Sequence, residues 1–219
     1  MNENLIAQRH SKRAFLNEPV TRRQLEQIFA AASHAASSKN TQPWQVAVVT
    51  GSTKDQLVSA MCKKFDADEF DGEDYTYMID PMPPEFKQRA RECGYGIYQT
   101  KGIAREDSAA RKAHFRENYT FFNAPVGLIF HLPKVAERGN FLDMGLFMQN
   151  VMLGITAEGL GACPQFSISA YSKTVREILK LDARIIVCGM AVGYPDESAV
   201  VNTFIPNRLP IEAFTTWHD

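Results

Sequence analysis

The sequence is poor in the features that mark disulfide, metal and membrane proteins. It contains only four cysteines, widely spaced and without a C-x-x-C pair: Cys62, Cys93, Cys163 and Cys188. Such scattered thiols are typical of reduced, mostly buried cysteines, not of a zinc site or a redox dithiol. No apolar run reaches the roughly 18 residues of a membrane span, and Met1 to Gln8 lacks the charged and apolar regions of a secretory signal. We therefore expect a cytoplasmic protein with no membrane partner and no metal.

An excess of charge of either sign is also missing. The chain has 24 Lys and Arg residues against 25 Asp and Glu residues, for a formal charge of -1. This balance disfavours a nucleic-acid partner, which requires a broad basic face. The 219 residues are 45% hydrophobic and 22% charged, as in ordinary globular domains. A chain of this length buries roughly 70% of its unfolded surface, so apolar packing is sufficient to hold the fold.

Several catalytic and nucleotide-binding motifs do not occur. There is no G-x-G-x-x-G after a strand, no G-x-x-x-x-G-K-[ST], no H-E-x-x-H and no G-x-S-x-G. A Rossmann nucleotide site, a P-loop, a zinc protease and an esterase are therefore unsupported.

Helices are predicted where apolar residues recur at helical spacing. Leu25, Ile28 and Phe29 recur in this way, with Thr21 and Gln24 as a capping box, so a helix should run from Thr21 to His34. Further helices are expected after Gly51, with a capping-box spacing at Thr53 and Gln56, and at 84–98, 107–117, 141–158 (with Asn140 as cap, and Gly159 and Gly161 at the end) and 172–181.

Strands are predicted at 45–50, 126–132 and 184–192, where β-branched and apolar residues form short runs. The stretch Asp66 to Glu85 holds eight acidic residues and no Lys or Arg, which indicates a surface loop or lid. The segment after Pro195 is extended, with no evident partner in its own chain. Without repeats or linkers, the pattern indicates one α+β domain.

The first polar cluster is R-H-S-K-R at Arg9 to Arg13. On a helical or turn-like backbone, Arg9 and Arg13 would share one face. Two guanidinium groups with the hydroxyl of Ser11 could then bind a phosphate. The alternative is a solvated basic terminus.

Three further clusters leave two interpretations open. The segment Ser37 to Trp44 could hydrogen-bond a flat polar heterocycle or satisfy its own turn. The glycines and proline of Gly159 to Gln165 would let a ligand approach the backbone, but they are equally typical of a helix end followed by a turn. The segment Asn202 to Pro210 carries one cation, Arg208, and could be a surface tail.

In this order, the clusters resemble the nitroreductase family of flavin enzymes. The resemblance covers nearly the whole chain, and F-F-N-A-P-V-G-L at Phe121 to Leu128 is similar to the subgroup that reduces nitrobenzoate-type compounds. Its motifs are R-H-S-K-R-x-F, S-S-K-N-T-Q-P-W, N-F-L-D-M-G-L-F-M-Q-N at Asn140 to Asn150, G-L-G-A-C-P-Q, G-M-A-V-G-Y-P-D at Gly189 to Asp196, and R-L-P. One departure is Ala36, where the family commonly has proline.

The resemblance implies a nitroreductase-like α+β fold, with a mixed, mainly antiparallel sheet flanked by helices. It also implies a homodimer that exchanges C-terminal arms and holds two noncovalent FMN molecules between its subunits. The residues expected to bind the phosphate, ribityl chain and pyrimidine edge are Arg9, His10, Ser11 and Arg13, with Arg208 as a further phosphate ligand. Ser37, Ser38 and Asn40 would approach the partner's flavin, while Pro164 and Gln165 would lie against the ring.

The same resemblance implies the reaction. FMN accepts hydride at N5 from NADH or NADPH and then reduces a small aromatic acceptor, a nitroaromatic or quinone, in a ping-pong cycle. No catalytic residue beyond the flavin is required, and Arg13 would stabilise negative charge near flavin N1. A lid or specificity insertion is expected at about 66–122, where half of the aromatic residues could instead be core. Two alternatives stay open: related flavin chemistry, such as reductive dehalogenation or flavin modification, and a flavin-binding module without turnover.

Overall fold

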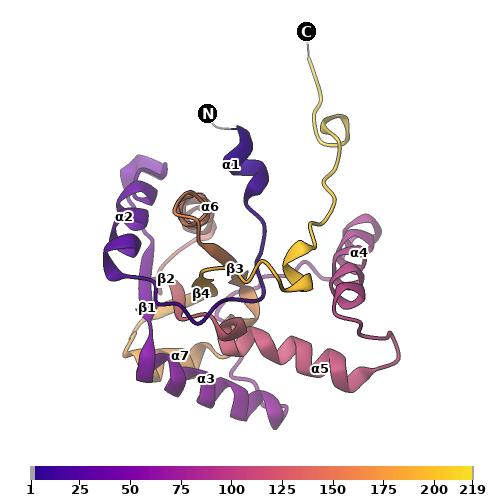
Figure 1. The fold of residues 1–219 in the computed structure, drawn as a ribbon. Helices are drawn as coiled ribbons and strands as arrows, with labels where there is room; N and C mark the ends of the chain where they lie inside the picture. The colour runs from indigo at the N-terminus through magenta and orange to yellow at the C-terminus, as the bar shows by residue number, and fades with distance from the viewer. Residues whose placement is uncertain (1–2, 219) are drawn as a thin grey trace.

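A four-stranded antiparallel sheet forms the centre of the fold in the computed structural model, which describes residues 3–218. The strands are ordered β1-β2-β4-β3, so β1 and β3 form the two edges (Figure 1). Their bounds are Gln45–Val49 for β1, Val126–Pro133 for β2, Gly161–Gln165 for β3 and Arg184–Gly193 for β4. Every ladder of this sheet is antiparallel.

The two inner strands are buried along nearly their whole length because helices cover both faces of the sheet. One face packs against α2 (Arg22–Ala32) and the apolar helix α6 (Arg138–Ala157). The other packs against α3 (Gly51–Asp66), α7 (Ser172–Leu179) and the 3-10 segment η2 (Glu117–Asn123). The expected α+β architecture is therefore confirmed.

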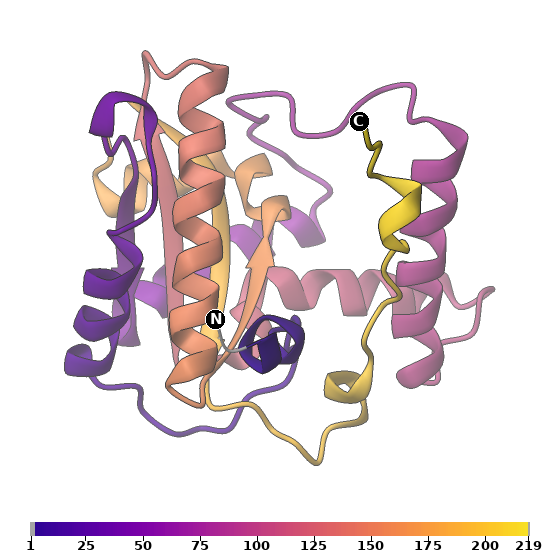
Figure 2. The ribbon, with the colours of Figure 1, turned by 90° about the horizontal axis from the view of Figure 1, so that it is seen from above.

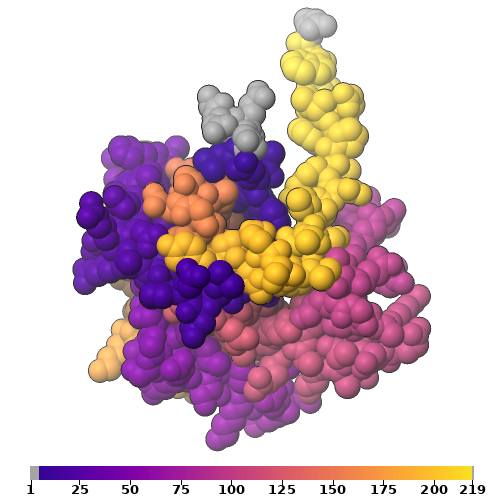
Figure 3. Space-filling model, viewed as in Figure 1, coloured from indigo at the N-terminus to yellow at the C-terminus, as the bar shows by residue number. Residues whose placement is uncertain are grey.

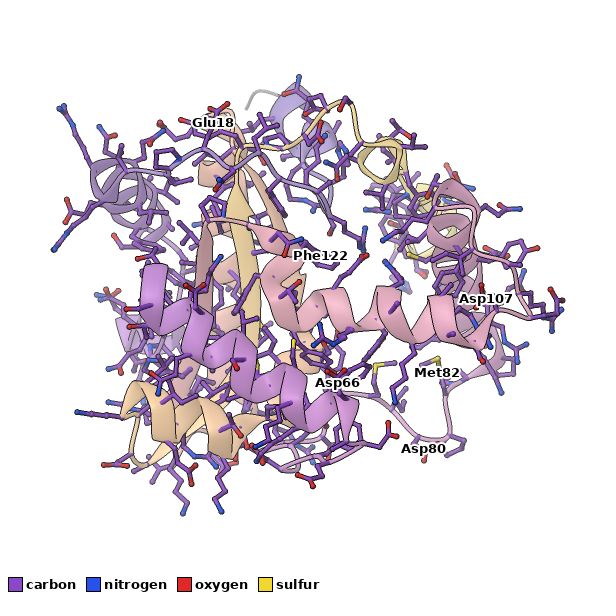
Figure 4. The ribbon with its side chains drawn as sticks, turned by 60° about the horizontal axis from the view of Figure 1, so that its bottom comes forward. Glu18, Asp66, Asp80, Met82, Asp107 and Phe122 are labelled. Atoms are coloured by element: carbon purple, nitrogen blue, oxygen red, sulfur yellow. The ribbon has the colours of Figure 1, made fainter. Side chains whose placement is uncertain are left out.

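Two helices stand to one side of this layered body. The irregular residues 67–83, here called the lid loop, lead from α3 to α4 (Pro84–Thr100), which is followed by α5 (Ser108–Arg116). Figure 4 shows the loop passing Asp80 and Met82, and α5 running from Asp107 back towards Phe122. Arg116 donates two hydrogen bonds to Asp66, which joins the end of α5 to the end of α3.

The chain ends in an extended segment, residues 204–218, here called the arm. It projects from the body in the space-filling view (Figure 3). The ring of Phe204 packs so closely on α4 that a Cβ placed on Gly96 would lie 2.2 Å from Phe204 Cε2. Glycine at position 96 thus allows the arm to start against α4. The remaining short elements are α1 (Glu3–Gln8), η1 (Ser38–Asn40), η3 (Phe166–Ala170), η4 (Val200–Thr203) and η5 (Ile211–Ala213).

Three local predictions were wrong. Helix α6 is capped by Glu137, with Asn140 as the reciprocal partner three residues later, so Asn140 is not the cap. Helix α3 begins at Gly51 after Thr50 and has no side-chain cap, which removes the capping box expected at Thr53. The segment Gly161–Gln165 is a buried strand, whereas the sequence suggested a turn. Among the described helices, none combines the length and the apolar character that crossing a bilayer demands.

Candidate functional site

The arginine segment, Arg9 to Arg13, lies beside the edge strand β3. Ser11 forms a parallel bridge with Ala162, and Lys12 N–H donates to the Ala162 carbonyl at 3.0 Å. The segment is extended, so the helical or turn-like backbone on which Arg9 and Arg13 would share one face is not the one that forms. Because side chains alternate along an extended chain, Arg9, Ser11 and Arg13 share one side.

That shared side is positively charged and partly buried. Burial raises the pKa of the Cys163 thiol, while Arg13, Ser11 and Arg9 oppose the rise, so all three lie close to that sulfur. Burial also lowers the pKa of Arg9, and proximity to Arg208 of the arm lowers it further. Neither Arg9 nor Arg208 forms an ion pair with any carboxylate of residues 3–218. Two neighbouring guanidinium groups without a counter-ion favour binding of a phosphate.

The alternate side chains of the arginine segment anchor it. The His10 ring nitrogens lie 2.8 Å from the Gln8 carbonyl and 3.1 Å from the Asn202 carbonyl. Lys12 Nζ is 3.0 Å from the Glu197 carboxylate. His10, predicted to bind the cofactor, is therefore held by backbone carbonyls in this chain.

Asn202 is a positioning residue that the sequence reasoning missed. Its buried side chain accepts from the N–H groups of Arg13 at 2.6 Å and Ala14 at 3.2 Å, and it donates to the carbonyls of Ala14 and Asp196. These bonds join the segment just before the arm to the arginine segment. In the sequence, the signal that could have identified this residue is a single asparagine shortly before the N-R-L-P motif.

Pro164 and Gln165 lie on opposite faces of β3. Gln165 is only 2% exposed and its Nε2 donates to the Asn118 carbonyl, so its side chain points into the core. Pro164 is half-buried and lines a cavity of 770 Å³. We call this the methionine cavity, after the residues Met144, Met148 and Met152 that line it together with Tyr75, Tyr77 and Phe166.

The lid loop closes one wall of the methionine cavity. Tyr75 Oη donates to the Val187 carbonyl at 2.6 Å, and burial raises the pKa of this phenol. The ring of Tyr77 stacks on Phe166 with centroids 4.2 Å apart. The later aromatic residues of the expected lid, Tyr119, Phe121 and Phe122, are instead buried in the core. For these three residues, the alternative that they belong to the core and not to the lid is correct.

The serine loop, Ser37 to Asn40, lies at the other edge of the sheet, between α2 and β1. Ser38 N–H donates to Asp143 Oδ1 at 3.1 Å, and Ser37 Oγ accepts from the Gln42 N–H. The side chains of Ser38 and Asn40 are exposed. Asp143 is buried on α6 with its Oδ2 unpaired. This lone carboxylate on an apolar helix was not singled out from the sequence.

The two groups of predicted cofactor residues therefore do not meet within one chain. The arginine segment lies beside β3 and the serine loop precedes β1, at the opposite edge of the sheet. Three strand spacings separate these edges, roughly 14 Å. Helix α6 also runs between them (Figure 2).

The sequence of the chain is similar to those of known nitroaromatic reductases. The chain is 33% identical over 217 residues to a chloronitrobenzene nitroreductase of Comamonas testosteroni, covering 98% of this chain and 96% of the relative. It is 35% identical over 212 residues to a 4-nitrobenzoate reductase of Pseudomonas putida, covering 96% and 92%.

Solved structures are similar over almost the full length. The FMN and NADPH-dependent nitroreductase NfnB from Sphigopyxis sp. strain HMH has a TM-score of 0.94 at 35% identity, with coverage of 99% of this chain and 98% of that one. The FMN-dependent nitroreductase NfnB from Mycobacterium smegmatis, in complex with NADPH, has a TM-score of 0.95 at 31% identity, with coverage of 99% and 97%. The family model of the Nitroreductase family matches residues 6–194. This chain therefore belongs to the nitroreductase family.

Proposed function

We propose that the protein is an FMN-dependent oxidoreductase that uses NADH or NADPH to reduce nitroaromatic or quinone-type acceptors. Family membership and the nitroaromatic reductases among its relatives support this proposal. One observation carries it: Arg9 and Arg208 lie near each other, and neither pairs with a carboxylate of residues 3–218. A phosphate-bearing cofactor supplies the missing negative charge.

The residues present fit FMN. Arg9 and Arg208 would hold the phosphate, and Ser11 and Arg13 lie on the same side of the extended segment. When bound, FMN supplies hydride transfer through N5. Arg13 would stabilise negative charge on the reduced ring, and the side chain of Pro164 would offer an apolar wall. The buried side chain of Gln165 leaves only its backbone to contact the cofactor.

The methionine cavity is suited to a flat aromatic acceptor. Tyr77 and Phe166 provide a stacked aromatic wall, and the methionine thioethers adapt to planar rings. Arg138 is the charged residue that lines this cavity. We infer that acceptors enter here, beside Pro164, and that the lid loop keeps water from the reacting atoms.

We further infer a homodimer in which each site draws on both subunits. A second copy would bring its serine loop to the arginine segment of the first. Exposed apolar side chains support this assembly, because a monomer leaves them in water: Leu142 and Leu146 on α6, and Ile205, Leu209, Ile211, Phe214 and Trp217 on the arm. Cytoplasmic location stays a prediction, which fractionation of the source cells would test.

Anaerobic titration of the purified protein tests the function. NADPH or NADH should bleach the flavin absorbance, and a nitroaromatic or quinone should restore it while being reduced. A protein that takes up FMN but is not reduced by either nucleotide would be a flavin-binding module. Reoxidation only by haloaromatic compounds would indicate reductive dehalogenation.

A further inference from the structure

A second large cavity, of 660 Å³, lies away from the methionine cavity, where α4 and α5 converge. The two cavities have no lining residue in common. We call this one the arginine cavity. Its lining residues are Arg91, Glu92, Gly94, Tyr95 and Tyr98 of α4, Ile103 and Arg105 of the connection, and Arg111 of α5.

Its three guanidinium groups have no carboxylate partner within the described chain. Other arginines do, since Arg116 pairs with Asp66 and Arg176 pairs with Asp74. The Nε of Arg111 is buried and has no hydrogen-bond acceptor. A buried N–H without an acceptor costs free energy until a ligand supplies one. Glu92 is the acidic residue in the lining, so three positive charges face one negative charge.

The cavity also offers an aromatic surface. Tyr95 is 52% exposed, which leaves its ring accessible for stacking. Tyr98 is held edge-on against His114, with ring centroids 5.7 Å apart, so it forms a fixed wall. Gly94 lies between these two tyrosines in the sequence, and a Cβ added there would meet nothing within 4 Å. The space beside the tyrosines is therefore open.

We propose that the arginine cavity binds a small aromatic anion, whose ring stacks on Tyr95 while its phosphate or carboxylate is held by Arg105 and Arg111. Guanidinium groups bind both kinds of oxyanion through paired hydrogen bonds. An anionic group would also give the buried Nε of Arg111 its acceptor.

Two kinds of molecule carry this chemistry. One is the adenosine 2′-phosphate end of NADPH, and the other is an aromatic carboxylate that binds here in addition to the acceptor in the methionine cavity. Glu92 also lines the groove between α4 and the arm that contains Arg208. The arginine cavity is thus one helix away from the expected FMN phosphate. The choice between the two sources rests on the proposed function, whereas binding of the anion does not.

Direct binding to the FMN-loaded protein tests the proposal. Isothermal titration should detect 2′-AMP, or a second molecule of 4-nitrobenzoate besides the one expected in the methionine cavity, with adenosine and nitrobenzene as uncharged controls that bind to the arginine cavity at least tenfold more weakly. Arg105→Gln with Arg111→Gln should weaken the charged probe about tenfold or more. Arg23→Gln, on an exposed residue of α2, should leave the affinity unchanged.

A blocking variant leaves the arginines intact. Gly94→Leu puts a side chain into the open space of a helical position, where it also favours the helix. It should abolish binding of 2′-AMP, or of the second 4-nitrobenzoate, while the matched Gly139→Leu on α6, where a Cβ also meets nothing within 4 Å, should not. Binding that survives both Gly94→Leu and the double arginine variant would overturn the proposal. Failure of 2′-AMP and of a second 4-nitrobenzoate to bind would also overturn it.

Steady-state kinetics identify which of the two molecules binds in the arginine cavity. If NADPH is the ligand, the double arginine variant raises KM for NADPH at least tenfold and leaves KM for NADH unchanged. If the aromatic carboxylate is the ligand, KM for both nucleotides is unchanged and the double arginine variant loses only the second 4-nitrobenzoate. If neither NADPH nor NADH reduces the flavin of the parent protein, the proposed function is contradicted. If reduction is intact but no probe binds, only the proposal for the arginine cavity is contradicted.

Discussion

The two edges of the sheet differ in charge and in how far their polar groups are satisfied. Beside β3, the guanidinium groups of Arg9 and Arg208 are close together and form no ion pair with the carboxylates that the structure describes. Beside β1, the serine loop is held by hydrogen bonds within its own turn and to Asp143. The first edge therefore requires an anion, while the second presents exposed, preformed hydrogen-bonding groups. We infer that each edge supplies a different half of one site and that two chains complete it.

Removing the arm should have the largest effect, because both dimer formation and FMN binding should be lost. A chain ending after Phe204 retains the Asn202 hydrogen bonds and the contact of Phe204 with Gly96, so its body should fold. It loses Arg208 and the exposed apolar side chains of the arm. Light scattering should show a monomer, and absorbance should show no bound FMN. A truncated dimer that binds FMN at full occupancy would remove the role given to the arm.

Loss of one phosphate ligand should have the next largest effect. Arg9→Ala or Arg208→Ala should cost about 1.5–3 kcal/mol of FMN binding, or ten- to hundredfold in affinity. Without FMN, Arg208→Ala should not lower the melting temperature, because it relieves repulsion of Arg9. Fluorescence titration and thermal melting check both statements, with Arg23→Ala as control. Unchanged affinity would make the mutated arginine a solvated surface residue.

Substitution of Asp143 tests the role of the serine loop at the β1 edge of the sheet. Asp143→Ala removes the acceptor of the Ser38 N–H, which should cost about 1–3 kcal/mol of stability and weaken FMN binding in the dimer. Asp143→Asn keeps an oxygen acceptor and should restore most of the FMN affinity. If both variants bind FMN like the parent protein, the serine loop does not contribute to the site.

The smallest expected effect is a pH dependence next to β1. His131 of β2 pairs with Gln45 of β1, and burial, with a contribution from Arg184, lowers its pKa to about 4. The unfolded chain binds a proton near pH 6.5 and the folded chain does not, so stability falls below pH 6.5 and levels off below about pH 4. The loss should reach about 1 kcal/mol at pH 5.5. Urea unfolding of the protein and of His131→Gln measures it, and equal pH slopes would contradict it.

Local signals predicted the helices and the inner strands well. Thr21 and Gln24 form the expected capping box, because that motif depends on residues three apart. Strand β3 was missed because its glycine and proline argue against a strand. Pro164 is tolerated there since β3 is an edge strand, where a missing N–H costs no ladder bond. Only the tertiary structure reveals that edge position.

The resemblance named candidate site residues, and the sequence did not predict their arrangement. The resemblance named Arg9 and Arg208, yet their proximity joins opposite ends of the chain and depends on the Asn202 tether. It also named Gln165, whose side chain turns into the core because the other face of β3 packs against η2. All of the cofactor roles stay predictions, namely those of Arg9, His10, Ser11, Arg13, Ser37, Ser38, Asn40, Pro164, Gln165 and Arg208. They concern a partner chain or a ligand, and no local pattern contains that information.

Subunit complementation tests the shared site most directly. One variant carries Arg9→Ala with Arg208→Ala, and the other carries Ser38→Ala with Asn40→Ala, so neither homodimer should bind FMN tightly. After mixing and subunit exchange, half of the dimers are mixed and each mixed dimer has one intact site. FMN occupancy and reductase activity should therefore recover to about a quarter of the parent value. Folded variants that exchange subunits but recover nothing would contradict the shared-site account.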